Sequence, residues 1–133
     1  LSRLVEEVLR ISSPSSNMFR RTTKDVEMHG VTIPENSILF ARFASANQDA
    51  DQFPEPEKFN LMRENLKEQV AFGKGVHHCL GAALSRREMN VGFKVILERM
   101  ENFRLAGGAS EPTFSANALL HGMTGLEIEF DKI

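Results

Sequence analysis

The chain has little cysteine, little net charge and no long apolar run, and each absence excludes a class of protein. One cysteine in 133 residues excludes an internal disulfide framework and is typical of a reducing compartment, so we expect a cytoplasmic location. A net charge of −2 at pH 7 gives no bulk attraction to nucleic acid. A membrane-spanning helix needs about 20 apolar residues, and neither such a run nor a signal-peptide pattern occurs. We therefore expect neither nucleic acid nor a membrane as a partner.

The first residues already follow a helical pattern. Leu1, Leu4, Val5 and Val8 fall on one helical face, with no initiator Met and no N-cap segment before them. We therefore expect the chain to be the C-terminal portion of a longer protein. This helix should end near Ser12–Pro14, because the residue before a proline avoids the helical region.

The next stretch predicts strands and then a loop. Residues 17–29 read as extended, and short strands are expected at 31–33 and 37–43, as antiparallel strands linked by hairpins. Residues 44–70 show no period and contain scattered prolines. Such a long irregular stretch suggests a structured functional loop.

Residues 80–100 carry the strongest helical pattern. Apolar positions form two stripes, which are Leu80, Ala83, Leu84, Val91 and Val95 on one face and Met89, Phe93, Ile96, Leu97 and Met100 on another. Apolar residues on two faces are typical of a helix buried inside a larger body. Strand candidates follow at 114–120 and 126–130, so the fold class is mixed α and β.

The only cysteine lies in a glycine-rich loop directly before this helix, within the run FGKGVHHCLG at residues 72–81. A thiol held against a helix N-terminus has a lowered pKa, which favours the thiolate. A thiolate at Cys79 can bind a metal or attack an electrophile.

Four interpretations of the loop compete with a haem site, and each fits poorly. Zinc needs spaced ligands for a tetrahedron, whereas His77, His78 and Cys79 are adjacent and the other histidines stand alone. A phosphate loop needs a Gly-Lys-Ser/Thr ending, which is missing here. A nucleophilic cysteine needs a base that is adjacent in space and itself oriented by a third group. An inert buried cysteine, the commonest fate of a lone thiol, leaves the loop's three glycines without a reason.

An axial thiolate on haem iron gives each loop residue a role. Gly73 and Gly75 would let the backbone turn tightly, and Gly81 would leave room for a flat macrocycle. The backbone N–H groups of Leu80 and Gly81 would donate to the sulfur. Phe72 would shield the sulfur from water, while His77 and an upstream arginine would bind the two propionates.

The loop motif Phe-x-x-Gly-x-x-x-Cys-x-Gly resembles the haem-binding signature of the cytochrome P-450 monooxygenases. It occurs here as Phe72, Gly75, Cys79 and Gly81. The resemblance implies haem b as the cofactor, with Cys79 as the ligand of its iron.

Three upstream segments agree with this family in order and spacing. Glu7 and Arg10 are similar to the Glu-x-x-Arg of its K helix, and residues 53–59 are similar to its meander. Residues 19–23 resemble the strand that supplies a propionate-binding arginine, at a place that matches Arg20. The resemblance covers essentially the whole chain and fits the soluble bacterial branch best.

The resemblance implies a C-terminal, mixed α and β part of a mainly helical fold. Its parts are the K helix, a small antiparallel sheet, the meander, the Cys-ligand loop, a long L helix and a C-terminal β-hairpin. Residues 1–133 would form the haem-thiolate portion of a larger single domain. The N-terminal part, which carries the family's oxygen-activating acid–alcohol pair, would be absent.

Two positions depart from the family pattern. Lys58 stands where the meander usually has an arginine that binds the K-helix pair. Lysine lacks the bidentate fork of arginine, so we expect either a looser network or a substitution by Arg63. His78 stands where the family commonly has an apolar or aromatic residue.

The resemblance also implies partners. The parent would insert one oxygen atom of dioxygen into a small apolar substrate, with electrons from a ferredoxin-type partner and an NAD(P)H-dependent reductase. Substrate-contacting positions would be Ser15, Asn17, Met18, Ala118 and Leu119. A basic docking patch would consist of Lys74, Arg86 and Arg87, although a solvated helix surface explains these three charges as well.

Two other functions stay open. One is a peroxygenase or reductase on the same haem scaffold. The other is a non-catalytic fragment, because helices built for burial on two faces expose apolar patches when they stand alone. We expect the isolated chain to bind haem poorly and to be inactive.

Overall fold

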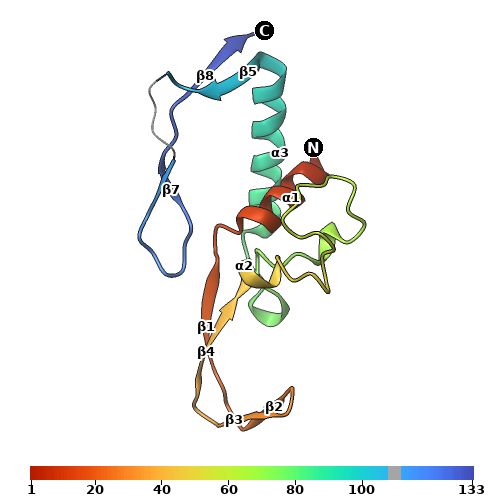
Figure 1. Cartoon of the computed structure of the whole chain (residues 1–133), viewed down its shortest axis with the longest axis vertical. Helices are drawn as coiled ribbons and strands as arrows, with labels where there is room; N and C mark the ends of the chain where they lie inside the picture. The colour runs from red at the N-terminus through yellow and green to blue at the C-terminus, as the bar shows by residue number, and fades with distance from the viewer. Residues whose placement is uncertain (108–111) are drawn as a thin grey trace.

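The computed structural model describes residues 1–107 and 112–133. Its elements are arranged along a central helix, α3 (Ala82–Arg99), which is crossed by α1 (Ser2–Ser12). Figure 1 shows a β-ribbon extending from one end of this helix pair and a second ribbon at the C-terminal end of α3. The sequence prediction of mixed helix and small antiparallel sheets is confirmed.

The core lies where α1 meets α3. Val5 and Leu9 of α1 are buried with Ala71, and three half-buried residues, Phe72, Met89 and Phe93, pack against them. Only one face of α3 takes part in this core. Apart from the buried Ala82, its other apolar side chains are exposed, among them Leu84, Val91 and Leu97.

The end of α1 confirms the proline signal. The helix ends at Ser12, and Ser13 has a left-handed backbone with φ 31°. The N–H of Ser13 donates to Leu9 O at 2.9 Å, which closes the last turn.

Four strands follow in two antiparallel pairs. β1 (Asn17–Arg21) pairs with β4 (Ile38–Arg42), while β2 (Val26–Met28) and β3 (Val31–Ile33) form the hairpin between them. The expectation that 31–33 pairs with 37–43 through a hairpin is wrong.

The break between the two pairs has a local cause at Thr22. Its hydroxyl donates to Pro34 O at 2.7 Å and accepts from Ser37 N at 2.9 Å. These bonds close the β1–β4 pair at Thr22 and let residues 22–25 leave the strand direction. One continuous extended segment over 17–29 is therefore not formed.

The long loop contains two short helices within its turns. They are α2 (Phe43–Ala46) and the 3₁₀ helix η1 (Leu66–Glu68). The loop has its own anchor in Phe53, which is 1% exposed. The Arg10 guanidinium lies 5.3 Å from the centroid of this ring, so the loop packs onto the end of α1.

The C-terminal strands differ in part from the prediction. β5 (Met100–Leu105) pairs with β8 (Ile128–Lys132), and β6 (Thr113–Phe114) pairs with β7 (Met123–Gly125) as the expected hairpin. A strand over 114–120 is wrong, because Asn117 Oδ1 accepts from Leu119 N and Leu120 N at 2.8 and 3.0 Å. This side chain turns the backbone locally and ends the strand.

No helix in the described part of the chain is long and apolar enough to cross a membrane.

Candidate functional site

A buried ion network joins α1 to the long loop. Glu7 and Arg10 are both fully buried. Arg10 donates from Nε to Glu7 Oε2 at 2.7 Å and from Nη2 to Glu7 Oε1 at 2.9 Å. Its Nη1 reaches the carbonyl of Asn47 at 2.8 Å. The three-residue spacing thus produces a bidentate pair rather than a surface ion pair.

Arg63 is the second cation of this network, and Lys58 is not. Arg63 Nε donates to Glu7 Oε1 at 3.2 Å, and its Nη atoms donate to the carbonyls of Pro54, Glu55 and Lys58. The Lys58 ammonium instead pairs with Glu55 at the surface. The expected alternatives were a looser network or a substitution of Arg63 for the family's arginine, and the geometry corresponds to the substitution. The expected role of the Lys58 side chain in the network is wrong.

The chemical state of Glu7 follows from these contacts. Burial acts to raise the pKa of Glu7, but hydrogen bonds from Arg10, the backbone of Asn60 and Arg63 outweigh it. The Arg10 charge acts in the same direction. The pKa of Glu7 is therefore lowered, and the carboxylate is ionised at neutral pH.

Sequence reasoning missed the polar residue that completes the network. Asn47 is fully buried; its Nδ2 donates to Ser13 Oγ and its Oδ1 accepts from Val70 N, both at 2.8 Å. It connects the end of α1 to the irregular segment that leads into the cysteine loop. An asparagine in an aperiodic stretch carries no local signal for this role.

The cysteine loop is a tight turn that leads into α3. Gly73 and Gly75 have φ of 70° and 77°, a left-handed conformation that favours glycine. The 3₁₀ helix η2 (Gly75–His77) follows, and the N–H of Cys79 donates to Phe72 O at 2.9 Å. The loop thus folds back so that Phe72 and Cys79 are adjacent.

Cys79 opens onto a hollow of about 430 Å³ whose lining is mostly apolar. Five of the residues predicted to bind haem line it, and they are Arg20, Phe72, Gly73, His77 and Cys79. Ser15 and Met18, expected to contact substrate, line it as well. The thiol is exposed. The hollow therefore combines a thiol, two basic side chains and an apolar wall.

Part of this wall was not anticipated. The missed residues are Leu9, Pro14, Phe43, Ala71 and Ser85. Phe43 also lies close to Gly73, where an added Cβ would be 3.7 Å from its ring. These residues come from four separate segments, and only the folded chain brings them together.

Leu80 and Gly81 lie beside the hollow rather than on its lining. The Leu80 side chain is fully exposed, and a Cβ at Gly81 would lie 3.8 Å from Cys79 Sγ. Donation from the N–H groups of these two residues to the sulfur stays a prediction.

The two segments expected to contact substrate lie side by side. The N–H of Ser16 donates to Leu119 O, and Asn17 Nδ2 donates to Ala118 O, both at 2.9 Å. A bridge between Ser15 and Leu120 extends this contact. Residues about 100 positions apart thus form one edge.

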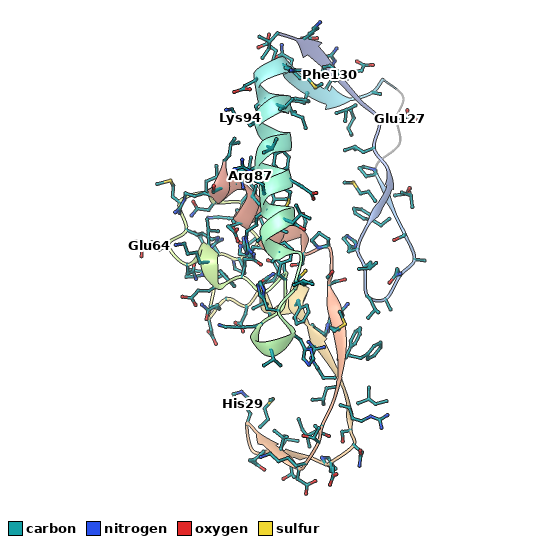
Figure 2. All side chains as sticks on the ribbon, turned by 180° about the vertical axis from the view of Figure 1, so that it is seen from behind. His29, Glu64, Arg87, Lys94, Glu127 and Phe130 are labelled. Atoms are coloured by element: carbon teal, nitrogen blue, oxygen red, sulfur yellow. The ribbon has the colours of Figure 1, made fainter. Side chains whose placement is uncertain are left out.

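The three candidate docking cations differ in their surroundings. Lys74 and Arg87 are exposed, and Figure 2 shows Arg87 on α3. Arg86 is bound instead, with its guanidinium on Glu6 at 2.6 and 3.1 Å and over the Phe72 ring at 4.7 Å. Arg86 is therefore engaged within the chain, and its part in a docking patch stays a prediction.

The histidines do not form a metal centre with the cysteine. His29 lies at the tip of the β2–β3 hairpin, away from α3 (Figure 2). Among residues 1–107 and 112–133, no three His, Cys, Asp or Glu side chains are grouped as metal ligands.

Comparison with known proteins identifies the family of this chain. The family description "Cytochrome P450" matches residues 1–130. The chain belongs to the cytochrome P450 family.

Relatives and solved structures are bacterial members of this family. Cytochrome P450 107B1 of Saccharopolyspora erythraea is 35% identical over 125 residues, which cover 93% of this chain and 31% of the relative. The vitamin D(3) 25-hydroxylase of Pseudonocardia autotrophica is 36% identical over 129 residues, or 96% of this chain and 32% of the relative. The substrate-free structure of Mycobacterium marinum cytochrome P450 CYP150A6 has a TM-score of 0.92 at 31% identity, covering 98% of this chain and 34% of that one. The chain thus spans about a third of the length of the P450 relatives it matches.

Proposed function

We propose that these residues form the thiolate-side wall of a haem site in a haem-thiolate monooxygenase. The observation that carries the proposal is the hollow that Cys79, Arg20 and His77 share with an apolar wall. An exposed thiol can bind iron, and two basic groups match the two propionates of haem b. When bound, a haem with a thiolate ligand supplies the electron donation needed to activate dioxygen.

The residues of the chain would have separate tasks at this site. Cys79 would hold the iron through its sulfur, while Arg20 and His77 would bind and orient the propionates. Phe72 would exclude water from the sulfur side, and Gly73 would supply the left-handed turn of the loop, with φ 70°. The buried Glu7 network would hold the long loop against α1.

The edge formed by residues 15–18 and 118–120 supports a substrate-contacting role at Ser15, Asn17, Met18, Ala118 and Leu119. The half-exposed and exposed apolar groups there suit a small apolar organic substrate. The names of two relatives, the vitamin D(3) 25-hydroxylase and 6-deoxyerythronolide B hydroxylase, agree with insertion of one oxygen atom from dioxygen.

Lys74 and Arg87 remain as exposed cations for an acidic ferredoxin-type partner, supplied by an NAD(P)H-dependent reductase in the cytoplasm. One solved relative, P450BioI, is in complex with an acyl carrier protein that carries hexadec-9Z-enoic acid, which is a protein partner but is not named as an electron donor. Electron delivery to the present protein therefore needs its own measurement, and a peroxygenase would be distinguished by turnover with peroxide alone.

The test uses the full-length protein, which is the whole product of the gene that encodes these residues. Its reduced, carbon-monoxide-bound spectrum should have the absorbance maximum typical of thiolate ligation, and Cys79→Ser should abolish it. His77→Gln should weaken haem retention, whereas His78→Gln, one residue away and outside the hollow lining, should not. A thiolate spectrum that persists in Cys79→Ser would overturn the proposal.

The 133-residue chain alone is expected to bind haem weakly. Its exposed apolar side chains on α3 and the open hollow support this expectation. A haem titration of the isolated chain that gave the same thiolate spectrum and affinity as the full-length protein would contradict it.

A further inference from the structure

Glu6 of α1 contacts both α3 and the segment that leads into the cysteine loop. Its carboxylate accepts two bonds from Arg86, at 2.6 and 3.1 Å, and one from Gln69 Nε2 at 2.9 Å. The side chains of the pair are partly covered, at 17% exposure for Glu6 and 34% for Arg86. This is a bidentate pair with a third polar contact, not an isolated surface ion pair.

Both contacts of Glu6 lead to Phe72. Through Arg86, a guanidinium is held over the face of the Phe72 ring at 4.7 Å from its centroid, within the range of a cation–π interaction. Through Gln69, whose Oε1 accepts from Ala71 N at 2.7 Å, the backbone just before Phe72 is held as well. One carboxylate thus fixes the ring face and the approach of the chain to it.

Phe72 in turn is connected to the sulfur. Its carbonyl accepts from the N–H of Cys79, and both residues line the same hollow. Its ring also lies 6.4 Å, centroid to centroid, from that of His78. Phe72 is therefore joined to Cys79 through the backbone and shares one wall of the hollow with it.

We propose that Glu6 and Arg86 are positioning residues for Phe72, and that this arrangement limits water at the Cys79 sulfur and so sets the reduction potential of bound haem. The inference rests on the proposed haem-thiolate function. Reduction adds a negative charge to the haem–thiolate unit, and a more polar surrounding stabilises the more charged state. Releasing Phe72 therefore raises the potential.

The decisive variant is Arg86→Lys, because it keeps the charge and loses the planar fork that binds Glu6 and stacks on Phe72. A purely electrostatic role predicts no change in potential. A positioning role predicts that the reduction potential rises. At a fixed applied potential, the ratio of reduced to oxidised protein should then increase by roughly two- to tenfold, which corresponds to the usual strength of a cation–π contact. Arg87→Lys, the same change one residue further along α3, is the matched control and should not shift the potential.

A double variant tests whether Arg86 acts through the ring. Phe72→Leu should raise the potential by itself, and adding Arg86→Lys should produce no further shift. Additive shifts, or a potential in Arg86→Lys equal to that of the wild type, would overturn the proposal. A merely structural role would lower the thermal midpoint of Arg86→Lys without moving its potential.

A haem-free measurement separates this proposal from the proposed function. Alkylation of the Cys79 thiol in haem-free full-length protein, followed by mass spectrometry of its peptide, should be faster in Arg86→Lys by roughly threefold, for release of a weak cation–π contact. Absence of the thiolate spectrum in the wild type would refute the haem-thiolate function. Equal alkylation rates in Arg86→Lys and Arg87→Lys would refute the positioning role, whatever the spectrum.

Discussion

The buried network around Glu7 and the hollow around Cys79 both include residues of α1, yet their charged groups have opposite surroundings. Around Glu7, each charged group has a partner inside the protein, and Glu7 and Arg10 have no exposed surface. In the hollow, the Cys79 thiol is exposed, and Arg20 donates to the carbonyl of the neighbouring Phe19. Charges that close on one another hold the fold, whereas groups that face a shared hollow are available to a ligand.

The adjacent residues Glu6 and Glu7 of α1 differ in a similar way, since each points toward one of the two regions. Glu7 points into the closed network, and Glu6 points to Arg86 beside the cysteine loop. Consecutive helical positions differ by about 100°, so one turn of α1 serves both regions. Changing one region and measuring both stability and haem binding tests this contrast between the closed network and the open hollow.

The largest effect on stability is expected at Glu7. Glu7→Gln leaves the buried guanidiniums of Arg10 and Arg63 without their anion, and breaking a buried ion pair costs about 3–5 kcal/mol. Chemical denaturation of the full-length protein measures the free energy of unfolding. The matched control is Glu57→Gln at an exposed position. A loss at Glu7 no greater than at Glu57 would contradict the closed network.

Acid should remove the same stabilisation gradually. The folded-state pKa of Glu7 is lowered below its ordinary value by its hydrogen-bond donors, in spite of burial. Its contribution is therefore complete above the unfolded pKa of about 4.3 and is lost as the pH falls through the lower folded pKa. Unfolding free energies measured between pH 3 and about pH 7 should show a smaller acid loss in Glu7→Gln than in the wild type. Parallel curves would assign the acid loss to other carboxylates.

An intermediate effect is expected at Arg63. Arg63→Lys keeps the charge but cannot reach Glu7 and three carbonyls at once, so we expect a loss of about 1–3 kcal/mol in unfolding free energy. Adding Lys58→Arg should not restore the loss, because position 58 faces Glu55 at the surface. Full restoration by the double variant would show that either position can complete the network.

The hollow should show the reverse pattern. Arg20→Gln is expected to change the unfolding free energy of haem-free protein by less than about 0.5 kcal/mol, since its partners in the described structure are few and local. Haem affinity should fall by about tenfold, the value of one charge-assisted hydrogen bond. Arg21→Gln, the adjacent position outside this hollow's lining, is the control. A large stability loss without a change in haem affinity would make Arg20 part of the fold rather than of the site.

The sequence predicted elements and motifs that depend on local spacing. Glu7 and Arg10 lie three residues apart, the end of α1 follows from Pro14, and the loop glycines surround Cys79, so each signal lies within a few residues. These features are therefore predictable from the sequence.

The features that were missed depend on tertiary contacts. Asn47 satisfies a buried group of α1 from 37 positions away, and no local pattern marks such a partner. Arg63, 56 positions from Glu7, was expected only because Lys58 departs from the family pattern. β5 was hidden because its first residue, Met100, also continued the helical stripe. The contacts of Arg86 were missed for the same kind of reason, since a basic residue near the start of a helix looks exposed until Glu6 and Phe72 are folded against it.

The smallest effect is expected at Lys58, and it tests the contrast most strictly. The Lys58 ammonium pairs with Glu55 only three residues away at the surface, where an ion pair adds little because solvent screens it. The hydrogen bond and charge of Glu55 raise the pKa of Lys58, which shows a contact but not a stabilising one. What Lys58 contributes to the network is its backbone carbonyl, which accepts from Arg10 and Arg63 at 3.3 and 3.0 Å. Lys58→Gln keeps that carbonyl, so both unfolding free energy and haem affinity should stay within error of the wild type. A loss approaching that of Arg63→Lys would mean that the ammonium, and not the backbone, holds the loop to α1.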